Sequence, residues 1–290
     1  MPAPQRRATL AGLCAIALWS SLALLTTLTG DMPPFQVLAT CFGIAAVTGL
    51  AWLATARGGL AAAFGAPRGA LALSVAGLFG YHALYFVALR HAPVIEANLL
   101  NYLWPLLIVL FAALLPGGKL RAAQVAGALL GLAAAVLLVT RGQAVTPDPA
   151  HAGGYLAALG AAVAWAGYSV LNRRNARVPT AAIVPACAVV ALLGAAAHFT
   201  FEDTVPPDAT QWLVLLAMGI GPTGLAFQLW DHGTKRGDLA LLGNLSYLAP
   251  LLSTLLLVAS GRAQPHPVQA AAVVLLLAGA WLGMRPAARH

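Results

Sequence analysis

Two amide side chains and a proline recur at helical spacing within a largely apolar run from residue 94 to 115. Asn98, Asn101 and Pro105 are three and four residues apart, which places them on one face of a helix, with Trp104 on its flank. Proline also leaves the carbonyl four residues back, that of Asn101, without its helical donor. This face offers amides, a carbonyl and an indole ring, groups that bind a solute without breaking its bonds.

A second face of the same kind appears half a chain later. Residues 246 to 255, SYLAPLLSTL, repeat the Tyr, Leu, Pro, Leu and Leu of residues 101 to 110, NYLWPLLIVL, at a spacing of 145. Pro250 takes the place of Pro105, and Asn244 and Tyr247 supply the polar side chains. Both prolines lie about eleven residues inside their runs, near the centre of a bilayer at 1.5 Å per residue. We predict that they are hinges facing a central cavity.

Other polar and aromatic groups lie in runs made otherwise of Ala, Leu, Val and Gly, where a buried amide or hydroxyl needs a partner. The predicted substrate-binding residues are Trp19, His82, Tyr85, Asn98, Asn101, Trp104, Trp165, Gln228, Asn244 and Tyr247. Tyr81 lies at the edge of the face of His82 and Tyr85, and Tyr168 lies in the same predicted span as Trp165. For each residue the alternative is a bond to a neighbouring helix or an interfacial anchor, and for His82 packing rather than proton transfer.

Charged residues narrow the class of solute. No Lys or Arg lies deep in a predicted span, so a multiply charged anion would lack a counter-ion there. We expect Glu96, near the end of its span, to pair with Arg90 in water, and Asp231 and Lys235 to belong to a solvated cluster beside a short loop. The remaining groups suit a small neutral or zwitterionic solute with an apolar or aromatic body. Its ammonium would meet carbonyls and ring faces, and its carboxylate would meet Asn and Tyr donors.

The elements that position these residues are membrane spans, because 60% of the 290 residues are apolar and only 8% are charged. Runs long enough to cross a hydrocarbon core predict ten helices. They extend approximately over residues 8 to 28, 35 to 54, 69 to 89, 94 to 115, 122 to 140, 153 to 171, 181 to 200, 211 to 230, 239 to 260 and 268 to 284.

The net charge is +8, and the distribution of the basic residues along the chain predicts how the protein is oriented in the membrane. Of the 16 Lys and Arg, 13 lie in the segments on the side of the two termini and three in the loops on the other side. This distribution predicts that both termini are cytoplasmic and argues against nucleic-acid binding. No sequence motif predicts a cofactor or a metal.

The repeat divides the chain into residues 1–145 and 146–290, each with five spans. Because five is odd, the second half must be inverted relative to the first, as in many secondary transporters. Gly77 and Gly80 recur as Gly221 and Gly224, one residue out of phase, and are predicted to let helices pack closely.

YFVALRHAPVIEANLLNYLWPLLIVL, the repeated YLxPLL and the two half-chains of five spans resemble the EamA family of the drug/metabolite transporter superfamily. Within that family ALRHAPVIEANLLNYLWPLL is most similar to exporters of aromatic amino acids of the YddG type. The resemblance implies a ten-helix inner-membrane carrier whose third, fourth, eighth and ninth spans line a cavity. Many members carry Gly-Glu after spans four and nine. Lys119 and Arg262 follow the glycines here, so no role of that glutamate transfers.

We therefore predict an all-α integral membrane protein with ten transmembrane helices in two inverted repeats. It would export small amino acids, in particular aromatic ones, and related metabolites across the bacterial inner membrane by alternating access at a midplane cavity. Its expected partners are that amino acid or a related zwitterion and the lipid bilayer, and one chain holding both halves is compatible with a monomer. The alternative is a proton-coupled exporter of lipophilic cations or drugs. A membrane enzyme or a passive channel fits less well, because the sequence has no HExxH, GxSxG or deep carboxylate pair.

Overall fold

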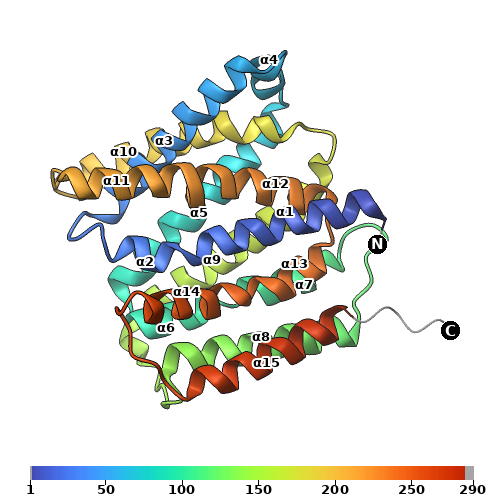
Figure 1. The fold of residues 1–290 in the computed structure, drawn as a ribbon, viewed down its shortest axis with the longest axis vertical. Helices are drawn as coiled ribbons and strands as arrows, with labels where there is room; N and C mark the ends of the chain where they lie inside the picture. Colours follow the sequence, from blue (N-terminus) through green and yellow to red (C-terminus); the bar gives the residue numbers. More distant parts are fainter. Residues whose placement is uncertain (1, 285–290) are drawn as a thin grey trace.

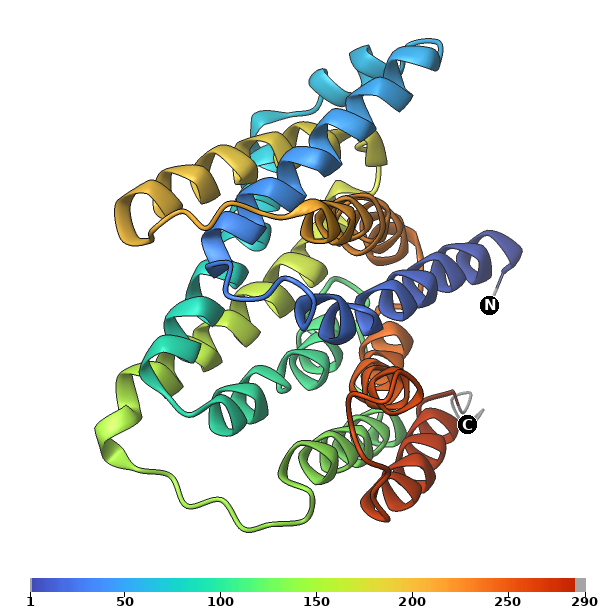
Figure 2. The same cartoon turned by 60° about the vertical axis from the view of Figure 1, so that its left-hand side comes forward.

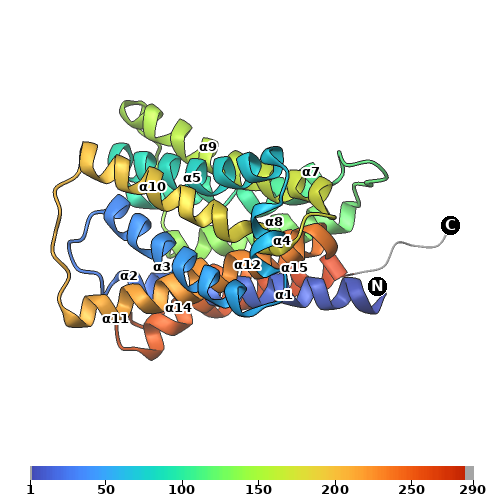
Figure 3. The same cartoon turned by 90° about the horizontal axis from the view of Figure 1, so that it is seen from above.

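The computed structural model describes residues 2–284, and in that range the chain is helical without a β-strand. Most helices run side by side across the view of Figure 1. The start of α1 and the end of α15 lie at the same end of the bundle, which we call the terminal end; the other is the opposite end (Figures 1 and 3). The prediction of an all-helical membrane protein is thereby confirmed in its coarse form.

The first half of the chain contains α1 (Ala3–Ser20), α2 (Leu22–Thr26), α3 (Pro34–Thr55), α4 (Gly59–Phe64), α5 (Arg68–His91), α6 (Val94–Asn101), α7 (Trp104–Ala112) and α8 (Ala122–Thr140). The second half contains the short helices η1 (Pro149–His151), η2 (Asn172–Asn175) and η3 (Thr180–Ala182), the π-helix η4 (Gly219–Leu225), and α9 (Ala152–Leu171), α10 (Ile183–Phe201), α11 (Ala209–Met218), α12 (Ala226–Arg236), α13 (Leu239–Ser246), α14 (Leu248–Ala259) and α15 (Val268–Met284).

Nine helical segments of the described chain are long and apolar enough to cross a bilayer. Six of these nine segments are built from consecutive pieces: α1 with α2, α6 with α7, η1 with α9 and η2, η3 with α10, α11 with η4 and α12, and α13 with α14. The segment Val268–Gly283 is apolar but shorter than these nine. The helix α4, between the second and third predicted spans, is an addition that the sequence analysis did not predict.

The strongest packing joins helices of different halves. α5 packs on α9, α1 on α12, α3 on α10, α7 on α13 and α8 on α15. Figure 2 shows the last pair, α8 and α15, side by side at one edge of the molecule. The two halves are therefore interleaved, and the central side chains come from both.

Two helices are interrupted one turn ahead of a proline. The break between α6 and α7 falls at residues 102–103, before Pro105, and that between α13 and α14 at Tyr247, before Pro250. Proline lacks a backbone N–H and its ring crowds the carbonyl four residues back, so the regular ladder cannot pass through these points. The hydroxyl of Tyr247 donates to the carbonyl of Tyr102, 3.1 Å away, and so satisfies a carbonyl at the other break.

A third interruption is the π-helix η4, which carries Pro222 inside it. The sequence analysis made no prediction from this proline. A π turn changes the local hydrogen-bond register. The carbonyl of Pro222 accepts a hydrogen bond of 3.0 Å from the indole Nε1 of Trp19. The irregular segment is thus linked to α1.

The four glycines predicted to pack helices lie in different surroundings. A Cβ at Gly77 would collide with the Tyr168 ring, and one at Gly224 would lie 3.5 Å from Cβ of Ala45. At Gly80 it would meet nothing within 4 Å, and at Gly221 only a methyl of Leu18 at 4.0 Å. Within each pair, one glycine lies at a helix contact and the other in more open space.

Candidate functional site

Aromatic rings from six helices meet at the centre of the bundle around Trp165 of α9. The ring centroid of Trp165 lies 5.5 Å from that of Trp19, 6.4 Å from Trp104, and 6.1 Å from Trp230, whose ring is stacked on it. We call the connected rings the aromatic cluster: Trp19, Phe35, Phe42, Tyr81, His82, Tyr85, Phe86, Trp104, Trp165, Tyr168, Phe227 and Trp230. Such rings offer faces that bind apolar, aromatic or cationic groups.

Hydrogen bonds fix two of the four indoles. Trp19 donates to the carbonyl of Pro222, and Nε1 of Trp230 donates to Oγ of Ser169 at 3.0 Å. Within the described residues, Trp104 and Trp165 make no hydrogen bond through their side chains and are held by ring and other apolar contacts. Because an indole N–H is a donor that seeks a partner when buried, these two rings are the ones able to donate to a bound solute.

Two tyrosine–asparagine pairs border the aromatic cluster. The hydroxyl of Tyr85 donates to Oδ1 of Asn98 at 2.6 Å, and Nδ2 of Asn101 donates to the hydroxyl of Tyr81 at 3.2 Å. Oδ1 of Asn101 is buried and has no hydrogen-bond partner among the described residues. A buried acceptor without a donor costs free energy, which a ligand donor would recover.

His82 faces aromatic neighbours. Its Nδ1 lies 2.7 Å from the carbonyl of Leu78. Since a carbonyl only accepts, Nδ1 carries the proton and Nε2 is left as an acceptor. The ring meets Phe42 and Tyr81 edge-on at 5.5 and 5.1 Å. His82 can therefore accept a hydrogen bond from a solute held between these rings.

The structure thus brings together Trp19, His82, Tyr85, Asn98, Asn101, Trp104 and Trp165 from the sequence prediction. It places Asn244 and Tyr247 apart from them. Asn244 packs beside Gly127 and Gly283, between α8 and α15, and its Nδ2 donates to the carbonyl of Ala240 at 2.9 Å. Tyr247 is fully buried over Gly131 of α8.

Gln228, the last of the predicted residues, is half-buried on α12. No hydrogen bond joins its side chain to a described residue. On the same helix, Phe227 and Trp230 are three residues apart, enter the aromatic cluster and were not predicted. Their helical spacing was a readable signal, but the predicted span ended at residue 230 and drew attention to the polar Gln228 instead.

The expectation for Asp231 and Lys235 is wrong. Both are buried rather than solvated, with a Nζ–Oδ2 distance of 2.8 Å and side chains only 2% and 3% exposed. Nδ2 of Asn172 donates to Oδ1 of Asp231 at 3.0 Å, and Nζ of Lys235 also donates to the carbonyl of Val178 at 3.2 Å. The helix α12 continues to Arg236, so the charges lie inside the bundle, near the terminal end. We call these four residues the buried ionic network.

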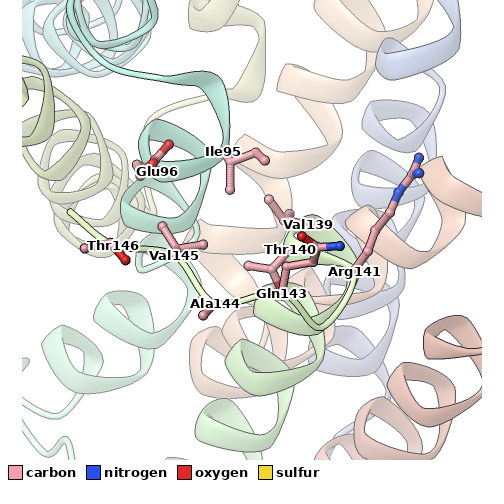
Figure 4. Close-up of a pocket in the computed structure, with 9 residues that line it drawn as sticks. All are labelled: Ile95, Glu96, Val139, Thr140, Arg141, Gln143, Ala144, Val145 and Thr146. Carbon is pink, nitrogen blue, oxygen red and sulfur yellow. The ribbon is translucent and has the colours of Figure 1, made fainter. Parts of the chain in front are cut away.

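A pocket of about 560 Å³ lies at the opposite end (Figure 4), lined by Ile95, Glu96, Val139, Thr140, Arg141, Gln143, Ala144, Val145 and Thr146. Figure 4 shows Glu96 and Arg141 on opposite sides of it. Within the described chain, the two ion pairs are Asp231–Lys235 and His198–Glu202, so the expected pairing of Glu96 with Arg90 is wrong. Oε2 of Glu96 is instead buried without a partner.

A second pocket, of about 720 Å³, opens at the terminal end. Its walls come from the C-terminal end of α7, the loop before α8, η2 and the start of α13. Four basic side chains line it: Lys119, Arg121, Arg173 and Arg174. We call it the basic pocket.

An all-helical bundle of membrane-length helices with polar and aromatic groups at its centre is the architecture of a multi-pass membrane transporter. The chain belongs to the EamA-like transporter family, which matches residues 6–140 and again residues 152–285. The resemblance predicted from the sequence is confirmed, and so is the prediction of a transporter rather than an enzyme.

Named relatives agree with this assignment. The chain is 50% identical to the aromatic amino acid exporter YddG of Ancylobacter novellus, over 94% of this chain and 95% of that protein. It is 27% identical to the aromatic amino acid exporter YddG of Escherichia coli K12, over 87% of this chain and 88% of that protein. A solved crystal structure, 48% identical, superposes with a TM-score of 0.91 and covers 97% of both chains. The fold is therefore shared along nearly the whole length.

Proposed function

We propose that the protein exports amino acids with an aromatic or other apolar side chain across the bacterial inner membrane. The observation that carries the proposal is the unpartnered, buried Oδ1 of Asn101 beside the aromatic cluster. An α-ammonium group supplies the missing donor, and the indoles of Trp104 and Trp165 stack with an aromatic side chain. The relatives named as exporters of aromatic amino acids support the same substrate class.

The proposed site holds a zwitterion without a charged side chain at the centre. The indole N–H groups of Trp104 and Trp165 and the hydroxyl of Tyr81 are the donors for a carboxylate. Asn101 and Nε2 of His82 are the acceptors for the ammonium group. Burial strengthens each of these hydrogen bonds, because the surrounding rings exclude water.

The architecture of this carrier is proposed to be ten spans, with α15 as the tenth, in two inverted repeats, residues 1–145 and 146–290. The packing pattern supports it. Exchanging the halves turns the pair α5–α9 into α12–α1 and returns α3–α10 and α8–α15 to themselves. The contact α7–α13, between the fourth and ninth spans, becomes α14–α6, for which there is no comparable contact among the described residues. Because 13 of the 16 Lys and Arg belong to segments on the side of the termini, we assign the terminal end to the cytoplasm.

Transport is proposed to proceed by alternating access, with bending at the breaks before Pro105 and Pro250. Each break divides a span into two helical segments, and the backbone hydrogen bonds are interrupted between them. Each segment can therefore tilt without the other. One chain contains both halves, and a monomer therefore suffices. No protonatable carboxylate lies in the aromatic cluster, which favours facilitated export down the substrate gradient.

The function is tested by efflux from proteoliposomes loaded with labelled Phe, Trp, Thr or tetraphenylphosphonium, with and without a pH gradient. We expect saturable efflux of Phe and Trp that shows counterflow and does not depend on the gradient. Cation efflux that requires the gradient would support the proton-coupled alternative. Flux without saturation or counterflow would indicate a channel.

Site variants locate the activity. We expect Trp165→Ala combined with Asn101→Leu to lower Phe efflux at least tenfold, because both stacking and a charge-assisted hydrogen bond are lost. Trp52→Ala is the matched control, because Trp52 is 62% exposed on α3, away from the cluster. Equal efflux by the site variant and the control would refute the assignment of the site.

The proposed hinges are tested separately. Replacing Pro105 and Pro250 together by alanine restores two backbone N–H donors and straightens both helices. We expect turnover to fall while the protein remains folded in the membrane and still binds Phe. Unchanged turnover of the double variant would rule out bending at these prolines as the transport step.

A further inference from the structure

The basic pocket has an excess of positive charge. Lys119, Arg121 and Arg174 are exposed, and none belongs to an ion pair within the described chain. Arg173 differs, because its Nη1 donates to the carbonyl of Gly237 at 2.6 Å. The one acidic residue of the lining, Asp238, is occupied as the cap of α13, where its Oδ1 accepts from a backbone N–H at 3.0 Å. The three unpaired cations are left to attract an anion.

A neutral side chain in the same lining also lacks a partner. Gln124, in the first turn of α8, is 6% exposed and lines the pocket. Its side-chain amide makes no hydrogen bond to any described residue. An amide that faces a pocket without a protein partner is free to bind a solute there, and its N–H groups suit an anionic oxygen. Gln124 therefore points independently to a ligand that accepts hydrogen bonds.

One part of the pocket wall is apolar. Val109 and Ala112 of α7 line it together with Leu239 of α13. A ligand that fills this space therefore combines an anionic group with an apolar body. An amino acid with an aromatic or aliphatic side chain has both.

The pocket is joined to the aromatic cluster by α7. This helix begins at Trp104, in the cluster, and reaches Ala112, in the pocket, eight residues later, or roughly 12 Å along the axis. Between the two sites, α7 packs tightly on α13: a Cβ at Gly243 would lie only 2.8 Å from the carbonyl oxygen of Pro105. The contact of α7 with α13 therefore separates the pocket from the cluster in this conformation.

We propose that the basic pocket is the loading site at which an amino acid binds from the cytoplasm before α7 and α13 separate to admit it to the aromatic cluster. Its carboxylate is held by Lys119, Arg121 and the amide of Gln124, and its apolar side chain lies against α7 and α13. This inference rests on the proposed function and on the assignment of the terminal end to the cytoplasm. It deepens that function by adding a substrate site outside the aromatic cluster.

The test compares KM on the two sides of oriented vesicles containing the full chain. We expect the double variant Lys119→Gln, Arg121→Gln to raise KM for Phe about tenfold from the cytoplasmic side, because it removes charge-assisted contacts with the carboxylate. The maximal rate from the cytoplasmic side and KM from the other side remain unchanged. Because facilitated transport requires the ratio of maximal rate to KM to be equal in both directions, the maximal rate from the other side is expected to fall about tenfold. Phenylethylamine, which lacks a carboxylate, serves as the second probe, and its KM is expected not to respond to the double variant.

Arg177→Gln is the matched control, because Arg177 is exposed near η2 and does not line the pocket. Since Lys119 and Arg121 are exposed, the double variant is expected to fold. Gln124→Glu provides a second variant, whose carboxylate repels that of the substrate, and we expect it to raise the cytoplasmic KM for Phe as well. An equal rise in KM from both sides, or an equal rise with Arg177→Gln, would overturn the proposal.

An anionic lipid is the competing occupant. The measurements are therefore made in phosphatidylcholine alone and in phosphatidylcholine with phosphatidylglycerol. A rise in KM in both membranes supports the loading site, whereas a rise only with phosphatidylglycerol would mean that the pocket binds lipid phosphate. Saturable efflux by the unaltered chain with no change of KM in the variants would refute the loading site alone. Absence of efflux by the unaltered chain would remove the proposed function and the loading site with it.

Discussion

The buried ionic network makes a quantitative prediction about stability. Asp231 and Lys235 are one helical turn apart on α12, and Asn172 and Val178 connect them to the segment that follows α9. Replacing one charged member leaves the other buried without its counter-ion. We therefore expect Asp231→Leu and Lys235→Met each to destabilise the protein strongly, and the double variant to be close to neutral.

The magnitude follows from the geometry. Two unit charges 2.8 Å apart attract each other by roughly 6 kcal/mol at an effective dielectric constant of about 20. The loss of hydration of both charges offsets much of this attraction, which is why an apolar pair of similar volume can replace a buried ion pair. Loss of one partner costs about 3–5 kcal/mol in such sites. Because Asn172 or Val178 still contacts the remaining charge, we expect about 3 kcal/mol for each single variant, at the low end of that range.

The assay is reversible unfolding by sodium dodecyl sulfate in mixed micelles, which gives the free energy of unfolding for each single variant and for the double variant. The coupling free energy of this cycle isolates the pair. Arg236→Met, on the exposed side of the same turn, is the control, and its effect is expected to stay within about 1 kcal/mol. Single variants that cost less than the control, or a double variant as unstable as the sum of the two, would refute this account.

Two further predictions use the same unfolding assay. Gly77→Ala places a methyl group against the Tyr168 ring and is expected to cost about 1–3 kcal/mol, whereas Gly80→Ala has free space and is expected to be neutral or to stabilise α5 by up to about 1 kcal/mol. The reverse order would contradict the packing. Tyr247→Phe removes the donor to the buried carbonyl of Tyr102 and is expected to cost about 1–2 kcal/mol. Unchanged stability would mean that this carbonyl has another donor.

The breaks in α6–α7 and α13–α14 were predictable from the sequence. The repeat places Pro105 and Pro250 at equivalent depth in two apolar runs, and proline interrupts a helical ladder for a local reason that no packing partner can remove. The aromatic character of the centre was predictable in the same way. Trp19, Trp104 and Trp165 lie in the middle of membrane spans, where the indole N–H finds a hydrogen-bond partner inside the bundle and not in the lipid. Local chemistry and the length of the runs were sufficient for these features.

The neighbours of each polar face were not predictable. Helical periodicity places Asn244 and Tyr247 on one face of α13–α14, but it does not say which helix covers that face. The glycines of α8 and α15 allow those helices to approach it, so both side chains lie away from the aromatic cluster. The burial of Asp231 was missed because α12 extends beyond the predicted end of the span, and the π-helix at Pro222 was missed because no simple sequence rule identifies one.

The two ends of the bundle differ in their contacts where the proposed two-fold relation would make them equivalent. Shifting by 145 residues places Phe86 opposite Asp231 and Arg90 opposite Lys235, and the shift of 144 that aligns the glycines of these spans places Val87 and His91 there. In neither register does the first half have a counterpart of the buried ionic network. The network ties α12 to the segment after α9 near the terminal end, whereas Phe86 meets Phe35 in an apolar contact, with ring centroids 5.2 Å apart. The Asp231–Lys235 pair lies within α12, so a movement of α12 away from that segment would break only the hydrogen bonds to Asn172 and Val178 and would leave two buried charges short of partners. Separating two phenyl rings leaves no charge without a partner. In the proposed alternating-access cycle the two ends would therefore differ in the free energy of opening, and this difference would favour one conformation of the carrier.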